Sequence, residues 1–155
     1  MSLADTLADL QARIGEEIHV SDWLTVTQDL VNRFADATGD HQWIHVDPDR
    51  AAKESPFGGT IAHGYLTLSL YPMLRGLVDP DKPLFPGVRN VINYGLNKLR
   101  FTNAVKVGDR IRARCKLLDV KEVKGALQIT EQYTVEIEGQ ERPACVAECI
   151  MLLYF

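Results

Sequence analysis

The sequence predicts an α+β fold in which an antiparallel sheet of about five strands wraps around one long buried helix. The segment 61–78 is apolar almost all round and carries Arg75 as its only charged side chain, which is typical of a helix buried on most sides. After Gly87, apolar and polar residues alternate with a period of two, which indicates long strands. With 155 residues, the whole chain (1–155) suits a single domain.

The first forty residues predict two helices separated by a strand. Leucines at helical spacing predict a short amphipathic helix over 3–13, and residues 17–25 have the pattern of a first strand. A second helix follows, because Thr27 can cap its first turn and Gly39 can end it.

Two prolines shape the predicted helices in the middle of the chain. The pair Asp47-Pro48 can start a short helix, with Ala51 and Ala52 facing the core. Within 61–78, Pro72 removes a backbone hydrogen bond and clashes with the preceding turn, so we expect a kink or a break there.

Four long strands are predicted over 88–101, 109–122, 125–139 and 142–155. In the second of them, apolar residues alternate with arginines and a lysine, so one face is expected to be buried and the other wet. The last strand is apolar on both faces, which suits a central strand or one that a partner covers. A sheet closed around a single helix leaves edges, and we expect a homodimer to cover one of them.

Composition and charge argue against several classes of protein. The net charge of −4 does not favour general nucleic-acid binding. No uncharged apolar run reaches about 18 residues, and acids stand where a signal peptide has its basic region, so neither a membrane span nor an export signal is expected. Cys115, Cys145 and Cys149 lack the spacing of a disulfide framework, which suggests free thiols and the cytoplasm. Serine-hydrolase and nucleotide-binding motifs are missing.

The stretch from Gly39 to His45, GDHQWIH, concentrates an acid, two histidines and a tryptophan. His41 and His45 are four residues apart and Asp40 is close, so nitrogen and oxygen ligands for a metal ion are available. The context is that of a loop and not of a helix, and the cysteines lie far away, so we predict no metal site. The two other interpretations are a polar loop and half of an active site.

Residues Phe34 to Leu70 resemble the MaoC-like dehydratase family of hot-dog-fold proteins, which includes the (R)-specific enoyl-CoA hydratases. The family pattern runs as a G-D-x-N-P-x-H core, then D-x-x-x-A, then A-H-G, and it is matched here by Gly39-Asp40, His45, Asp47, Ala51 and Ala62-His63-Gly64. The order of segments fits nearly the whole chain. The branch that includes the nodulation protein N-like proteins is the most similar, because Gln-Trp replaces Asn-Pro there, as Gln42-Trp43 do here.

The resemblance implies a hot-dog fold and the reversible hydration of a trans-2-enoyl-CoA to an (R)-3-hydroxyacyl-CoA, without a metal or redox cofactor. Asp40 and His45 would form the catalytic acid/base pair. Gly64 would offer its backbone N–H to the thioester carbonyl. Gln42 and His63 are further candidates for contacts with the substrate.

The chemistry of hydration needs residues of these types. Water is a poor nucleophile, so the reaction needs a base on water, a proton at C2 and stabilisation of the enolate oxygen. A carboxylate and an imidazole that flank one water supply the first two roles. A glycine at the start of a buried helix lets the thioester approach free N–H groups. The structural alternatives are a turn aspartate, a core histidine and a packing glycine.

Two departures from the family pattern leave other functions open. Gln42-Trp43 stands in place of Asn-Pro, and Pro72 aligns with a helix serine that some hydratases of this family have. An acyl-CoA thioesterase on the same fold would use Asp40 and Gly64, although His45 favours hydration. A non-catalytic acyl-thioester binding module is the third possibility.

Charge is unevenly distributed along the chain. Residues 1–60 carry eleven acids against four bases, whereas residues 89–124 carry ten bases against three acids. The basic segment is either the solvated face of strands or a surface for a phosphorylated ligand. For the second case the candidates that bind the phosphates of coenzyme A are Lys98, Arg100, Arg112 and Arg114. An acidic acyl carrier protein would suit the same edge.

Overall fold

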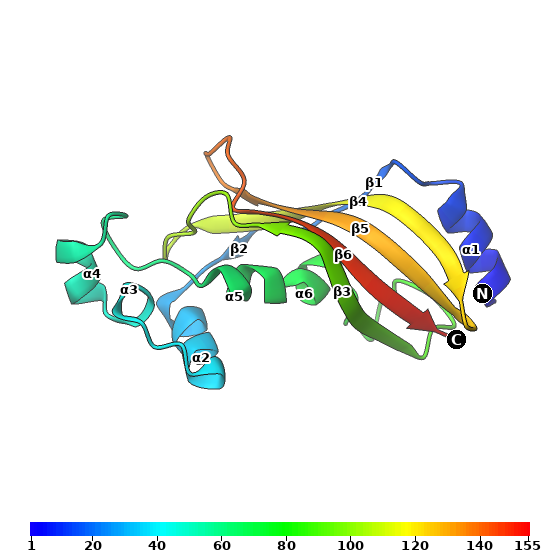
Figure 1. Ribbon diagram of the computed structural model, residues 1–155, viewed down its shortest axis with the longest axis horizontal. Coiled ribbons are helices and arrows are strands. Elements are labelled where there is room, and N and C mark those ends of the chain that lie inside the picture. The colour runs from blue at the N-terminus through cyan, green and yellow to red at the C-terminus, as the bar shows by residue number, and fades with distance from the viewer.

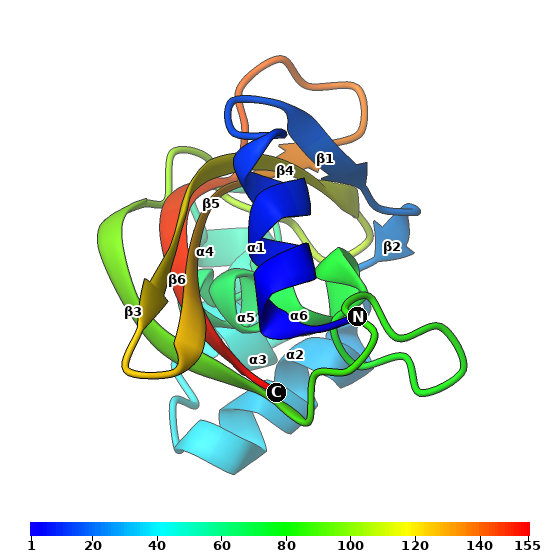
Figure 2. The same cartoon turned by 90° about the vertical axis from the view of Figure 1, so that its right-hand side faces the viewer.

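The computed structural model describes residues 1–155 as one curved antiparallel sheet that wraps around a short helical core (Figures 1 and 2). The strand order is β1-β4-β5-β6-β3, and β2 pairs with β4. The predicted α+β class is therefore confirmed, with six strands. The strands are β1 (Glu17–Val20), β2 (Leu24–Thr25), β3 (Asn90–Arg100), β4 (Arg110–Val123), β5 (Ala126–Ile137) and β6 (Cys145–Tyr154).

The helices occupy three places relative to the sheet. The central pair, α5 and α6, lies in the concave side of the sheet, as the end view in Figure 2 shows. At one end α1 lies near both chain termini, and at the opposite end α2, α3 and α4 gather (Figure 1). The helices are α1 (Leu3–Gln11), α2 (Gln28–Thr38), α3 (Trp43–Val46), α4 (Pro48–Glu54), α5 (Gly64–Ser69) and α6 (Tyr71–Arg75).

The central helix is shorter than predicted and is broken. It begins at Gly64 and ends at Arg75, and the break falls at Leu70, between α5 and α6. Pro72 lies in the first turn of α6, where its missing N–H is tolerated, so the interruption expected from this proline is confirmed. The predicted first strand is also divided, because residues 21–23 between β1 and β2 are not a strand, although Ser21 still bonds to Ala113 of β4.

Capping residues set the limits of the helices before the core. The Thr27 side chain accepts a hydrogen bond from the N–H of Leu30 at 3.1 Å, and that of Asp47 accepts one from Arg50 at 3.0 Å. Gly39 ends α2 in the left-handed conformation, with a φ of 83°. These three predictions are confirmed. Ala51 is fully buried as expected, but Ala52 is exposed, because the short helix α4 turns only one narrow face inward.

The predicted burial pattern of β4 and β6 is confirmed. On β4 the apolar residues Ile111, Ala113, Cys115 and Leu117 are fully buried. The doubly apolar β6 lies between β5 and β3, where both of its edges are hydrogen-bonded. No helix of the structure is long and apolar enough to cross a membrane.

An ionic cluster lies inside the core, beneath α6. The guanidinium of Arg75 and the carboxylate of Glu131 on β5 are 2.9 Å apart, and both side chains are almost completely buried. The Tyr71 hydroxyl donates to the same carboxylate at 2.7 Å. Arg75 Nη1 is buried without a partner. This cluster ties α6 to the middle of the sheet.

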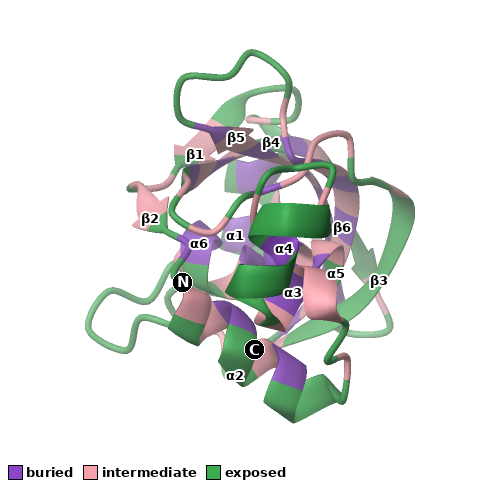
Figure 3. Ribbon diagram, turned by 90° about the vertical axis from the view of Figure 1, so that its left-hand side faces the viewer, coloured by how far each residue is buried: buried purple, intermediate pink, exposed green.

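The edge strand β3 is exposed along most of its length (Figure 3). One edge of β3 pairs with β6, and the opposite edge is unpaired, because β3 is the last strand in the sheet order. Three large apolar side chains of β3 are accessible to solvent, with exposed fractions of 47% for Ile92, 63% for Tyr94 and 42% for Leu96. Such a strand is a ready template for pairing with another chain.

Candidate functional site

Asp40 is the first residue after the left-handed turn at Gly39, in the loop that leads to α3. Its carboxylate accepts hydrogen bonds from the Gln42 side chain at 3.2 Å and from the Gln42 backbone N–H at 3.4 Å. Desolvation raises the pKa of Asp40, but the two bonds from Gln42, together with the nearby His45 and His63, outweigh it, so the pKa lies below its ordinary value. Asp40 is therefore an ionised carboxylate at neutral pH.

His45 lies on α3, a helix of one turn that the sequence analysis treated as a loop. Its side chain is buried, and Nδ1 is 2.7 Å from the backbone carbonyl of Ile61. A carbonyl oxygen can only accept, so Nδ1 carries the hydrogen and the lone pair of the neutral ring is on Nε2. The second nitrogen is thus available as a base.

Gln28 on α2 supports the backbone on both sides of this histidine. Its side-chain amide donates to the carbonyl of His45 at 2.8 Å, and its amide oxygen accepts from the Thr60 hydroxyl at 2.6 Å. The N–H of Ile61 donates to the carbonyl of Ile44 at 3.1 Å. These bonds hold α2, α3 and the segment before α5 together.

His63 completes a cluster with Asp40 and His45. The rings of His45 and His63 are stacked, with centroids 3.8 Å apart and planes 24° apart. Nε2 of His63 is 2.9 Å from the backbone carbonyl of Asp40. A side-chain nitrogen or oxygen of each residue lies within 4.8 Å of the others. The structure therefore brings the two residues of the predicted pair together, and adds His63 to them.

The cluster has the spacing of a metal site but not a suitable orientation. In nearly parallel stacked rings the in-plane lone pairs run side by side and do not converge on one ion. One nitrogen of each ring also already donates to a carbonyl. His41 is outside the cluster, because its exposed ring is 2.9 Å from Asp36, and this hydrogen bond raises the pKa of His41. The absence of a metal stays a prediction.

Gly64 is the first residue of α5 and lines a cleft of about 430 Å³. Its N–H makes none of the turn, loop or cap hydrogen bonds, so it is free to donate. Asp40 and His45 do not line this cleft, but Ile61, whose carbonyl holds His45, does. The cleft is lined by Phe57, Ile61, Ala62, Gly64, Thr67, Phe101, Thr102, Asn103, Ala104, Val105, Arg142 and Ala144.

Packing also requires a glycine at position 64. A Cβ added there would lie 2.6 Å from the ring of Phe101, which is closer than a real Cβ contact. We expect Gly64→Ala to lower the free energy of unfolding by about 1–3 kcal/mol through overpacking, measured by urea denaturation. Gly59→Ala is the control, since its added Cβ meets nothing within 4 Å. If Gly64→Ala is equally destabilising in a Phe101→Ala background, this explanation is wrong.

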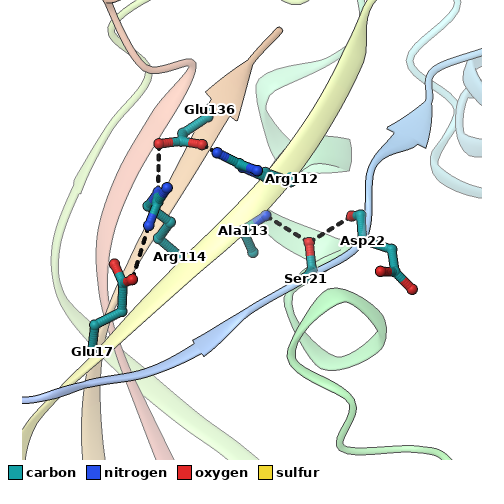
Figure 4. A network of polar contacts seen from close by, with 7 residues as sticks. All are labelled: Glu17, Ser21, Asp22, Arg112, Ala113, Arg114 and Glu136. Carbon is teal, nitrogen blue, oxygen red and sulfur yellow. Dashed lines mark hydrogen bonds and ion pairs between the residues drawn. The ribbon is translucent and has the colours of Figure 1, made fainter.

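The structure does not bring Arg112 and Arg114 to the cleft at Gly64. Both guanidinium groups pair with Glu136 of β5 at 2.6 Å, and Arg114 also pairs with Glu17 at 2.8 Å (Figure 4). Arg112 stacks on Trp23, 4.4 Å from the ring centroid. Both charges are therefore already neutralised by carboxylates, which speaks against a phosphate-binding role for this pair.

Lys98 and Arg100 lie on the exposed strand β3, and their phosphate-binding role stays a prediction. Lys98 is 3.8 Å from Glu148, and Arg100 bonds only to the backbone carbonyl of Leu99. The sequence analysis missed Arg142, which lines the Gly64 cleft. It stands outside the basic segment, in the loop between β5 and β6, so charge patterning gave no signal for it.

A family model supports the resemblance seen in the motifs. The model of the MaoC-like domain matches residues 9–139. The chain is 53% identical over 152 residues to 3-hydroxyacyl-thioester dehydratase Z of Mycobacterium tuberculosis, covering 97% of each protein. It is 47% identical to nodulation protein N of Rhizobium leguminosarum bv. viciae, covering 97% of this chain and 92% of that protein.

Solved structures show the same hot-dog fold. A structure described as a monoamine oxidase regulatory protein from Archaeoglobus fulgius has a TM-score of 0.75 and 27% identity, covering 90% of this chain and 89% of that one. The (R)-hydratase from A. caviae involved in PHA biosynthesis has a TM-score of 0.69 and 26% identity, covering 88% of this chain and 95% of that one.

Proposed function

The chain is an enzyme of the MaoC-like dehydratase family, and from this premise we propose that it catalyses the (R)-specific, reversible hydration of a trans-2-enoyl-CoA to an (R)-3-hydroxyacyl-CoA. The observation that carries the proposal is the pairing of an ionised Asp40 with His45, whose Nε2 bears a free lone pair. The names of the dehydratase and of the (R)-hydratase to which the chain is similar support it.

The protons present on Asp40 and His45 before the reaction decide which proton reaches C2 of the substrate. Hydration adds OH to C3 and H to C2, so no proton is gained or lost overall. The bond to Ile61 leaves Nε2 of His45 as an acceptor, and Asp40 is a carboxylate, so neither group offers a proton to the substrate at the start. The proton that the pair removes from water is therefore the one that it delivers to C2. Developing charge on the thioester oxygen would be stabilised by the free N–H of Gly64, without a metal ion.

Gln42 acts on Asp40 in this scheme. Its backbone N–H and its side-chain amide both donate to the carboxylate, so Gln42 holds Asp40 in place and favours its ionised form. The ring of Trp43 lies under the guanidinium of Arg50, whose Cζ is 4.3 Å from the ring centroid. The residues that replace Asn-Pro thus have definite contacts within the loop. A direct contact of Gln42 or His63 with the substrate stays a prediction.

The test is the loss of the conjugated enoyl absorbance when the purified protein is mixed with crotonyl-CoA or with longer 2-enoyl-CoA thioesters. Turnover at any chain length supports the proposal, and a chelator is expected to leave the rate unchanged. Release of free thiol from saturated acyl-CoA would indicate a thioesterase instead. Tight binding of enoyl-CoA without turnover would indicate a binding module.

We also propose that the enzyme is a homodimer that pairs through β3, and that it works in the reducing cytoplasm, which its three free, buried thiols support. Tyr94→Asp places a charge on the exposed face of β3, so it is expected to convert the dimer to a monomer in light scattering at micromolar concentration. Val20→Asp, on the opposite edge strand β1, is the control. A Tyr94→Asp protein that stays dimeric would place the interface elsewhere.

A further inference from the structure

We propose that His63 is a positioning residue, which holds Asp40 and His45 in their reactive arrangement and stays electrically neutral while His45 exchanges its proton. The inference rests on the hydratase function proposed above. It gives His63 a role different from the contact with the substrate that the sequence suggested.

The hydrogen bond of His63 defines its protonation state. Nε2 faces the backbone carbonyl of Asp40 at 2.9 Å, so Nε2 must carry a hydrogen. Nδ1 is buried and has no hydrogen-bond partner among the protein atoms. A second hydrogen on Nδ1 would be a buried donor without an acceptor, which is costly. The ring is therefore a neutral imidazole with a single N–H.

The surroundings of His63 favour the same state. Burial lowers the pKa of His63, and the bond to the Asp40 carbonyl, which acts in the opposite direction, does not compensate. The charged or titratable groups that face it are Asp40 from the loop, His45 from α3 and the more distant His41. The fourth neighbour is the uncharged ring of Phe34 on α2, with centroids 4.9 Å apart.

Neutrality matters because of the stacking on His45. Two imidazolium rings with centroids 3.8 Å apart would repel each other, so a charged His63 would oppose the protonation of His45. A neutral ring permits it. The N–H of the His63 ring holds the backbone of Asp40, and the face of the same ring packs against the ring of His45. One residue therefore aligns both members of the pair.

A pair of amide variants separates this role from a general need for a polar side chain. The amide nitrogen of Gln can occupy the place of Nε2, whereas that of the shorter Asn cannot reach the Asp40 carbonyl. We expect His63→Gln to keep turnover within about tenfold of the wild type and His63→Asn to lose on the order of 10²-fold in kcat, because small misplacements of reacting groups have effects of this size. Thermal unfolding checks that both variants fold.

The pH profile distinguishes positioning from direct proton transfer. In His63→Gln the fall of activity on the acid side is expected at the same pH as in the wild type, because the proposed base, Nε2 of His45, is still present. If that fall disappears in His63→Gln, then His63 is itself the titrating base. If His63→Asn is as active as the wild type, the hydrogen bond to Asp40 has no positioning role.

Nitrogen-15 NMR of the wild-type imidazoles gives a reading that does not depend on turnover. We expect His63 to show one protonated nitrogen, Nε2, between about pH 6 and 8. Protonation of both His63 nitrogens within that range would overturn the inference. Failure of the wild type to hydrate any enoyl-CoA would instead refute the proposed function, and the NMR result would still decide the state of His63.

Discussion

Asp40→Asn and His45→Gln are each expected to lower turnover of enoyl-CoA by about 10²–10⁴-fold, the usual contribution of a positioned acid–base group. The Asn side chain removes the negative charge that takes up a proton, and the Gln side chain removes the lone pair of Nε2. Because the two residues are proposed to act on one water, the double variant should be little worse than either single one. Loss of the enoyl absorbance measures the rate.

His41→Gln is the matched control for this pair. It is a histidine of the same loop, but it is exposed and its ring bonds to Asp36 and not to the cluster. We expect it to leave turnover unchanged. An active Asp40→Asn/His45→Gln protein would refute the assignment of the site, whereas inactivity of His41→Gln would show that the loop as a whole, and not the pair, carries the effect.

Glu131→Ala is expected to lower the free energy of unfolding by about 3–5 kcal/mol, because it leaves the buried guanidinium of Arg75 without its counter-charge. The three hydrogen bonds from Arg75 to this carboxylate, and the one from Tyr71, would all be lost. Urea denaturation of the wild type and the variant at neutral pH measures the difference.

Two comparisons isolate the effect of burial at Glu131. Glu138→Ala removes a carboxylate whose partner, Arg110, is 3.0 Å away, but both side chains are about half exposed, so a loss below about 1 kcal/mol is expected. Replacing both charges, as in Arg75→Met/Glu131→Leu, should recover much of the stability that Glu131→Ala loses. Equal losses for Glu131→Ala and Glu138→Ala would contradict the argument.

Local patterns were sufficient to predict most of the fold. Apolar and basic residues alternate in 109–122, which predicts one buried and one solvent-exposed face at any position in a sheet. β4 shows that pattern. The effect of Pro72 is equally local, because the ring removes a hydrogen bond within its own turn. Two segments, 39–45 and 62–64, resemble the pattern of a known family. That resemblance suggested pairing Asp40 with His45, which the spacing of the two residues alone did not establish.

Contacts between distant segments were not predictable in the same way. The basic side chains of β4 looked free in the sequence, but the pairing register places Arg112 directly opposite Glu136. The one-turn helix α3 has no cap or repeat that would identify it, and it forms because tertiary bonds from Gln28 and Ile61 hold its backbone. Nδ1 of His63 is likewise buried without a partner only because α2, α3 and α5 pack around the ring, which no local pattern predicts.

The unpaired edge of β3 makes the stability of the protein depend on its concentration if the proposed homodimer forms there. An 11-residue strand with an unpaired edge and exposed aromatic and aliphatic side chains invites aggregation when it is left alone. If a second copy covers it, folding and association become one equilibrium, and stability rises with the amount of protein present. Dilution would then dissociate the dimer and expose β3 to solvent. A protomer without its partner would therefore be prone to precipitation.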